Sequence, residues 1–165
     1  MADFSRRFSS SRQDWATPQS LFAKVDQEFS FTLDAAASDE NTKVLDSYFT
    51  EKDNAFSKSW GNNTVWLNPP YGGKNKSLQE WVRKAYKESC SGATVVMLIP
   101  ARTNTNWFHD LALGKGEVRF VRGRPKFGDV THGLPQPLCY VIFRPNLKDI
   151  LSTTPARNTS QIGEG

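Results

Sequence analysis

Residues that build metal sites and disulfides are scarce in this chain of 165 residues. Its two cysteines, Cys90 and Cys139, lie far apart and form no CxxC pair, which argues against a zinc site. The two histidines, His109 and His132, lack a metal-ligand spacing, and we assign neither a role. The sequence therefore predicts two free thiols in a reducing compartment and no bound metal.

Long apolar runs and hydrolase motifs are also missing. No stretch approaches the roughly 18 apolar residues of a membrane span. The polar start MADFSRRFSSSRQ lacks the apolar centre of a secretory signal. The chain has no P-loop, HExxH motif or Ser/His/Asp set, so NTPase and hydrolase functions lack support. We expect a cytoplasmic protein with no membrane partner.

The composition is typical of one folded domain. Hydrophobic residues make up 38% of the chain, and the formal net charge of +4 suits an anionic partner such as nucleic acid. We expect the domain to span residues 14–150. Residues 1–13 and 151–165 lack apolar periodicity and are expected to be a flexible basic N-terminal arm and a flexible C-terminal tail.

Strand and helix patterns alternate along the domain. Apolar runs predict strands within residues 30–37 and at residues 65–68, 94–100, 118–123 and 138–143. Helices are predicted to begin at Thr17-Pro18, with Thr17 as N-cap, at the capping box of Ser77 and Glu80, and over residues 104–113. Continuous apolar strands separated by helices indicate an α/β fold with a mainly parallel sheet.

Three polar residues stand at the ends of the predicted strands. Asp34 ends the first strand, Asn68 ends the second, and Arg102 follows the third. In parallel α/β sheets, ligands bind beyond the carboxyl ends of the strands. The sequence therefore places its candidate site at this edge of the sheet.

The most informative segment is Asn68-Pro69-Pro70-Tyr71. The amino group of a nucleobase is a poor nucleophile, and neutral, preorganised acceptors for its hydrogens favour the pyramidal form that attacks. The Asn68 side-chain oxygen and the Pro69 carbonyl can accept these bonds, and the two prolines stiffen the loop. Tyr71 offers a flat face for a base that has been flipped out of the duplex. The motif favours amino methylation over a plain rigid strand exit, but it does not distinguish adenine, guanine and protein glutamine.

Five segments together resemble the phage-type Dam family of DNA adenine-N6 methyltransferases: DWATPQSLF (14–22), FTLDAAASDENTK (31–43), VWLNPPYG (65–72), LIPARTNTNWFH (98–109) and VRGRPKFG (121–128). The resemblance runs from about Asp14 to Phe143. It implies a compact Rossmann-like fold, S-adenosyl-L-methionine as the methyl donor, no metal, and adenine N6 in DNA as the acceptor. A phage or prophage origin, and protection of phage DNA from restriction, fit the family.

The resemblance also implies which residues bind the cofactor: Thr17, Pro18, Asp34, Ala35, Ala36, Asp53, Ala55 and Phe56. Small side chains after Asp34 let the cofactor approach the backbone closely. Asp53 corresponds to a position that meets the adenine ring, whose amino group can donate to a carboxylate. The run Ala35-Ala36-Ala37 replaces the glycine-rich GxG loop of other methyltransferases. For Asp34, the alternative is a carboxylate that caps a helix.

Two polar and basic clusters are candidates for binding DNA. The first cluster comprises Arg102, Thr103, Asn104 and Trp107. The second cluster comprises Arg122, Arg124 and Lys126 and lies next to Arg119. Strand alternation would put some cations of the second cluster on one face, and Phe127 is a candidate stacking residue. The alternatives are helix-capping Asn and Thr with core aromatics, which we expect for Phe108, and a solvated basic strand.

Two further functions remain open on the sequence alone. The first is methylation of a different acceptor: RNA, cytosine or a protein side chain. The basic clusters disfavour a protein acceptor. Cytosine is disfavoured because enzymes that methylate cytosine more often carry Ser in place of Asn68. The second is a non-catalytic DNA-binding module of the same fold. Sequence preference is assigned to loops at residues 72–77 and 124–137.

Overall fold

The computed structural model describes residues 16–72, 76–127, 136–146 and 148. The expected N-terminal arm and C-terminal tail lie outside these residues. So do residues 73–75 and 128–135, which belong to the two loops to which sequence preference is assigned, and His132.

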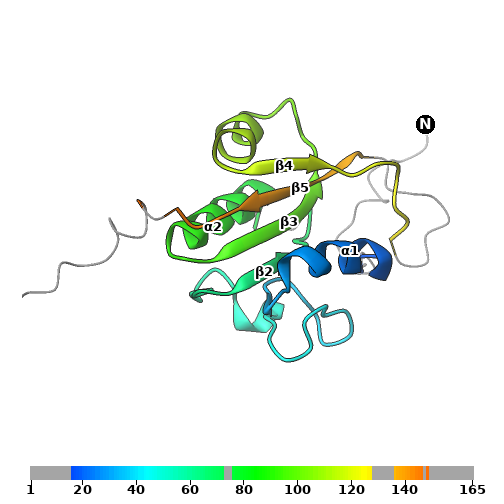
Figure 1. The fold of residues 1–165 in the computed structure, drawn as a ribbon, viewed down its shortest axis with the longest axis vertical. Coiled ribbons are helices and arrows are strands. Elements are labelled where there is room, and N and C mark those ends of the chain that lie inside the picture. The colour runs from blue at the N-terminus through cyan, green and yellow to red at the C-terminus, as the bar shows by residue number, and fades with distance from the viewer. Residues whose placement is uncertain (1–15, 73–75, 128–135, 147, 149–165) are drawn as a thin grey trace, which may run out of the picture.

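A five-stranded sheet forms the centre of the described part of the chain (Figure 1). Its order is β1 (Leu33–Asp34), β2 (Thr64–Leu67), β3 (Thr94–Pro100), β5 (Leu138–Phe143) and β4 (Glu117–Phe120). β1, β2 and β3 pair in parallel, whereas β5 is antiparallel to both β3 and β4. The sheet is therefore mixed. The predicted parallel pairing is confirmed for β1 to β3 and wrong at β5, because an apolar run does not encode strand direction, which depends on the path of the connecting segment.

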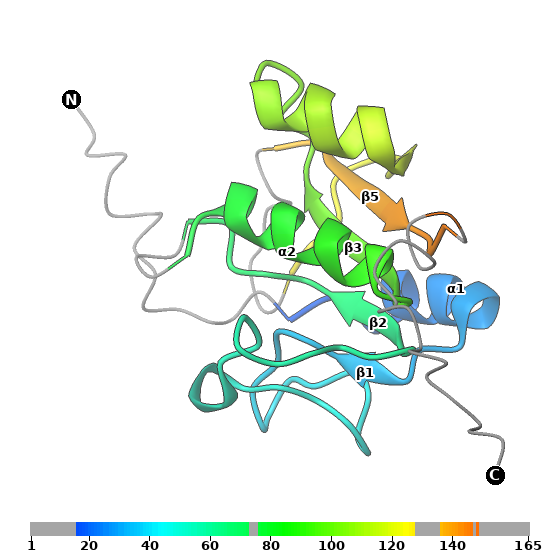
Figure 2. The ribbon, with the colours of Figure 1, turned by 90° about the vertical axis from the view of Figure 1, so that its left-hand side faces the viewer.

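Helices cover both faces of the sheet (Figures 1 and 2). α2 (Leu78–Cys90) and η3, a π-helical segment (Phe108–Leu113), pack on one face, and α1 (Gln19–Phe29) packs on the other. Along β3, Val95, Met97 and Ile99 face α2, while Val96 and Leu98 face α1. All five are fully buried, which explains the continuous apolar run of this strand.

The predicted helix starts differ in accuracy. The capping box of α2 is confirmed, since the Ser77 hydroxyl accepts from the Glu80 N–H and the Glu80 carboxylate accepts from the Ser77 N–H. The predicted start of α1 is one residue early, because Pro18 is the N-cap and makes no side-chain cap. The predicted cap residue, Thr17, lies outside the helix, and its hydroxyl contacts Asn68 instead.

The predicted strand at residues 118–123 is shifted. β4 spans Glu117–Phe120, and Gly123 has a φ of +79°, a left-handed conformation that an extended strand does not adopt. The basic residues that follow therefore lie beyond the strand, so strand alternation does not govern where they point.

A buried carboxylate holds the segment that leads into β2. Trp60 is fully buried, and its N–H donates to the Glu88 carboxylate of α2 at 2.8 Å. The Lys84 ammonium pairs with the same carboxylate and donates to the Lys58 carbonyl at 2.8 Å. The indole N–H of Trp60 donates to the Ala55 carbonyl at 3.0 Å. These bonds fasten residues 55–60 to α2.

The two cysteines are free thiols, as predicted, and burial raises the pKa of Cys139 to about 12. Within the described ranges, no helix has the length and apolar character needed to cross a membrane.

Glu88→Ala should destabilise the fold strongly. It leaves the buried Trp60 N–H without its acceptor and the Lys84 ammonium without its partner, at a cost of about 3 kcal/mol. Glu88→Gln, which keeps an oxygen acceptor, should lose less. Urea unfolding measures both, with the exposed Asp46→Ala as a control. Equal stability of Glu88→Ala and the control would refute this assignment.

Candidate active site

The residues that follow β1, β2 and β3 meet at one edge of the sheet, because these strands are parallel. Asp34 pairs with Trp66 of β2, two residues before Asn68. The Arg102 guanidinium donates to the Tyr71 carbonyl at 3.4 Å. The prediction that Asp34, Asn68 and Arg102 stand at the carboxyl ends of three strands is confirmed.

The side-chain amide of Asn68 is held from two sides. Its nitrogen, Nδ2, donates to the Thr17 hydroxyl at 3.0 Å. Its oxygen, Oδ1, accepts from the Tyr71 hydroxyl at 2.8 Å. Because one hydroxyl contacts the nitrogen end and the other contacts the oxygen end, both ends of the amide are held in place.

Tyr71 directs its hydroxyl into the protein. The hydroxyl lies 3.1 Å from the Leu98 carbonyl as well as 2.8 Å from Asn68 Oδ1, and its single proton can serve one of them at a time. The ring is half-buried and packs against the apolar clusters on both sheet faces. Burial of the hydroxyl raises the pKa of Tyr71 above its ordinary value. The hydroxyl therefore supports Asn68, and stacking of a base on the ring stays a prediction.

The two prolines between these residues differ in exposure. Pro69 is buried, and Pro70 is exposed. A buried proline directly after Asn68 restricts the backbone from which the amide projects. The role of the Pro69 carbonyl as an acceptor for a substrate amine stays a prediction.

Asp34 organises the backbone after β1. Its carboxylate is almost fully buried and accepts the N–H groups of Ala36 at 3.3 Å and Lys43 at 2.9 Å. Burial raises the pKa of Asp34 despite these hydrogen bonds, which act in the opposite direction. The alternative of a helix cap is wrong, because an irregular loop follows β1. The carboxylate fixes that loop instead.

Hydrogen bonds also connect this loop to the start of α1 and to residues 47–49, which lie beside it. The Lys43 ammonium donates to the Gln19 side chain at 3.3 Å. Ala37 donates to the Phe49 carbonyl at 2.9 Å, and Phe49 donates to the Asp34 carbonyl at 2.8 Å. The loop after β1 therefore lies beside α1 on one side and beside Phe49 on the other.

An open pocket of about 280 Å³ lies between residues 37–40 and residues 50–52. It is lined by Ala37, Ser38, Asp39, Glu40, Thr50, Glu51 and Lys52. Sequence reasoning identified only Ala37 among these residues, as part of the turn that replaces the glycine-rich loop. The signal that was present is the acidic pair of Asp39 and Glu40 directly after the small residues that follow Asp34.

The predicted cofactor residues Asp53, Ala55 and Phe56 differ in exposure and in the residues that they contact. Asp53 is exposed, and its carboxylate accepts the N–H and hydroxyl of Thr50, each at 2.7 Å, which lowers the pKa of Asp53. Through Thr50, Asp53 borders the pocket. Ala55 is buried, and the Phe56 ring packs against Trp81 of α2, with ring centroids 4.5 Å apart.

The two basic clusters flank the start of β5. Ala101 donates to the Pro137 carbonyl at 2.9 Å, and Val121 donates to the Leu138 carbonyl at 3.0 Å. Arg102 and Arg122 follow these two residues directly, on either side of β5. Since β3 and β4 run in the same direction, both clusters lie at the edge that carries Asn68.

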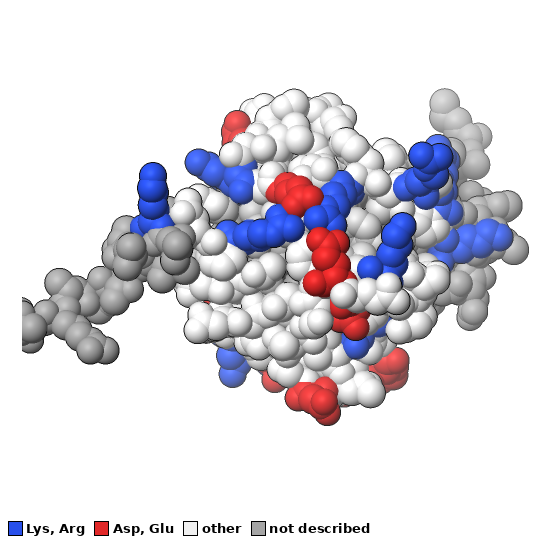
Figure 3. Space-filling view, in the orientation of Figure 1, with Lys and Arg blue, Asp and Glu red and all other residues white. Residues whose placement is uncertain are grey.

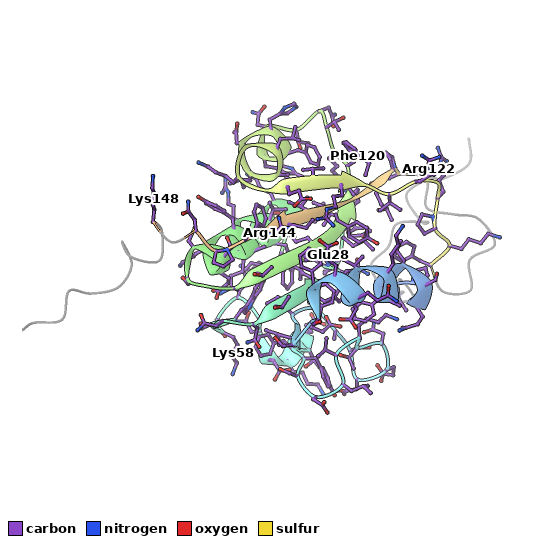
Figure 4. The ribbon with its side chains drawn as sticks, viewed as in Figure 1. Glu28, Lys58, Phe120, Arg122, Arg144 and Lys148 are labelled. Carbon is purple, nitrogen blue, oxygen red and sulfur yellow. The ribbon has the colours of Figure 1, made fainter. Side chains whose placement is uncertain are left out.

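The second cluster presents exposed cations. Arg122, Arg124 and Lys126 are exposed, and no described carboxylate forms an ion pair with them. Figure 3 shows Lys and Arg side chains without acidic neighbours at the right of the view, where Figure 4 places Arg122, whereas acidic side chains run from the centre of this face to its lower edge. The charge is therefore divided between different parts of the surface.

Two other residues of this basic segment have surroundings that the sequence did not predict. Arg119 forms two hydrogen bonds to Glu28, at 2.6 and 2.9 Å, and a third to Glu117, so it joins β4 to α1 rather than standing free. Phe127 is fully buried in the cluster under α1 and is not a surface stacking residue.

In the first cluster, Thr103 and Asn104 are exposed. Trp107 is half-buried against the core, and Phe108 is fully buried, as expected. No group of three or more His, Cys, Asp or Glu that could hold a metal ion occurs in the part of the chain that the structure describes.

Comparison with known proteins gives one distant and two informative similarities. A crystal structure of a Thermoplasma acidophilum protein superposes with a TM-score of 0.40 at 9% identity, over 75% of this chain and 85% of that one; a likeness of this size does not identify a fold. A DNA N-6-adenine-methyltransferase of Escherichia phage T1 is 33% identical over 112 residues, which cover 67% of this chain and 45% of the relative. The family described as DNA N-6-adenine-methyltransferase (Dam) matches residues 5–160. This chain therefore belongs to the DNA N-6-adenine-methyltransferase (Dam) family.

Proposed function

We propose that this protein transfers a methyl group from S-adenosyl-L-methionine to the N6 amine of adenine in DNA. The observation that carries the proposal is the Asn68 amide, which two hydroxyls hold at the carboxyl end of β2. Membership of the family supports the reaction. The same family and the α/β architecture support a Rossmann-like methyltransferase fold, and the phage relative supports an origin in a phage or prophage and action in the host cytoplasm.

Asn68 supplies the acceptor for the reacting amine. A neutral amide oxygen that accepts a hydrogen from the adenine amine raises the electron density on its nitrogen without placing a full charge in the site. An amide oxygen can accept two hydrogen bonds, so the bond from Tyr71 is compatible with this role. Preorganisation by Thr17 and Tyr71 avoids a cost of orientation during the reaction.

The residues after β1 fit the cofactor. S-adenosyl-L-methionine carries a sulfonium whose methyl group is activated for transfer, an ammonium group, a carboxylate and a ribose diol. The pocket offers the carboxylates of Asp39, Glu40 and Glu51, which suit cationic and hydroxyl groups, and Lys52 also lines it. Its volume of about 280 Å³ lies just below the roughly 300 to 1,000 Å³ of ligand sites, so it would hold part of the cofactor. The Ala35 and Ala36 turn leads into this pocket from the edge that carries Asn68. We therefore assign the cofactor to the turn and the pocket.

The basic clusters supply the surface for DNA. Exposed cations at Arg122, Arg124 and Lys126, together with Arg102, Thr103 and Asn104, flank the catalytic edge and suit phosphate contacts. A target base must leave the duplex to reach Asn68. Phosphate contacts on both sides of β5 would hold the duplex while the base is extruded.

Incubation of the purified protein with tritiated S-adenosyl-L-methionine and unmethylated plasmid DNA tests the function directly. Nucleoside analysis of the digested DNA should detect N6-methyladenine. Parallel reactions with RNA and protein acceptors separate this proposal from the alternatives. Labelled RNA or protein with unlabelled DNA would overturn it.

Asn68→Ala should reduce methylation by about 100-fold or more, because it removes a preorganised acceptor at the reacting amine. Binding of S-adenosyl-L-methionine, measured by calorimetry, should change little. The exposed Asn62→Ala provides a control for loss of an amide elsewhere on the chain. Full activity of Asn68→Ala would rule out this residue as the amine acceptor.

The double variant Arg122→Ala/Arg124→Ala should weaken DNA binding at all sequences. The slope of log affinity against log salt concentration should fall by about one for each phosphate that the variant no longer binds. Lys58 lies far from Arg122 in Figure 4, so Lys58→Ala removes a positive charge without touching the proposed surface. Fluorescence anisotropy at several salt concentrations compares the two variants with wild type, and equal slopes would contradict the assignment.

A further inference from the structure

Thr17 has surroundings that the sequence did not predict. It is 4% exposed and lies just before α1, yet its hydroxyl contacts a residue 51 positions further along the chain. The resemblance to the family implies that Thr17 binds the cofactor. In the structure, its hydroxyl accepts from Nδ2 of Asn68 at 3.0 Å.

We propose that Thr17 is a positioning residue that fixes the orientation of the Asn68 amide for methyl transfer; this inference rests on the proposed function. The two ends of an amide have nearly the same size and shape but opposite hydrogen-bonding character. A rotation of 180° would point the Asn68 NH₂ group, a donor, at an amine that is itself a donor. In the structure the Thr17 hydroxyl accepts from the NH₂ group, and in a rotated amide this hydroxyl would have to turn and donate instead.

The position of Thr17 is set by rigid elements. The Pro18 carbonyl accepts the N–H groups of Leu21 and Phe22 and so begins α1 at Gln19, two residues after Thr17. The Phe22 ring packs edge-on against Trp66 of β2, with ring centroids 5.2 Å apart. Trp66 lies two residues before Asn68. α1 is therefore docked on the strand that presents Asn68, and it delivers the Thr17 hydroxyl to the amide.

Tyr71 alone is a weaker constraint on the amide. A tyrosine hydroxyl can donate or accept, and this one also lies 3.1 Å from the Leu98 carbonyl. If its proton turned to Leu98, the hydroxyl oxygen could accept from the NH₂ group of an inverted amide. With Thr17 on the opposite end of the amide, both hydroxyls would have to exchange donor and acceptor roles together, so the second contact restricts the rotation.

Thr17→Val and Thr17→Ser separate the hydroxyl from the packing of the side chain. Valine keeps the shape but cannot accept a hydrogen bond, whereas serine keeps the hydroxyl. Thr17→Val should lower kcat about 10-fold to 100-fold, by analogy with the loss found when a hydrogen-bond partner that orients a metal-binding residue is removed. The Kd for S-adenosyl-L-methionine and the KM for DNA should stay within about threefold of wild type. Thr17→Ser should restore kcat to near the wild-type value.

Three results would overturn the inference. An equal loss of kcat in Thr17→Ser and Thr17→Val would indicate packing. A higher Kd for the cofactor with unchanged kcat in Thr17→Val would indicate the cofactor contact that the resemblance implied. Wild-type kinetics in Thr17→Val would show that the contact does not matter. If wild type itself methylates no adenine, the proposed function falls as well; if it does, only the role of Thr17 falls.

A measurement on the wild-type protein keeps the test independent of activity and of the folding of the Thr17 variants. The side-chain NH₂ resonances of Asn68 are assigned by their loss in Asn68→Ala. A nuclear Overhauser effect from these protons to the Thr17 methyl group is expected. Its absence in the folded protein would overturn the inference.

Discussion

The parallel pairing of β1, β2 and β3 is the constraint on which the rest of the site depends. β1 and β2 are short, but the direction that they share with β3 brings Asp34, Asn68 and Arg102 to one edge. The side chains of β3 are buried on both faces, so this strand anchors the register of its neighbours. Packing of α1 and α2 on opposite faces then leaves the carboxyl edge as the place where polar residues gather.

Charge is divided along that edge in a way that suits two different ligands. Carboxylates line the pocket beyond β1, and exposed cations flank β5. In the proposed function, a cationic cofactor and an anionic duplex approach Asn68 from different sides, and each meets a surface that carries mainly the opposite charge. Arg119 does not contribute to this division, because Glu28 and Glu117 engage its guanidinium and raise its pKa.

Much of the local structure was predictable because its causes are local. The alternation and length of apolar runs identified β2, β3 and β5, and the Ser77/Glu80 box identified the start of α2. The placement of Asn68 at a strand end also followed from the run of apolar residues before it and the two prolines after it. Predictions failed where a neighbour distant in sequence decides the outcome. From the sequence, Thr17 was predicted to be a helix cap, Phe127 a stacking residue and Arg119 part of a basic cluster. In the structure, Thr17 contacts Asn68, Phe127 is buried under α1, and Arg119 pairs with Glu28.

By itself, the sequence determined that this is an α/β domain with the Asn68-Pro69-Pro70-Tyr71 motif after a buried strand, together with its resemblance to the family. These features depend on periodicity and on neighbouring residues, which a linear chain displays directly. Only the tertiary structure decided that β5 runs antiparallel, that an acidic pocket lies beyond β1, and that Thr17 and Tyr71 hold the two ends of one amide. The reason is that hydrogen bonds between residues 51 positions apart depend on where α1 docks on β2, and that docking is set by packing in three dimensions.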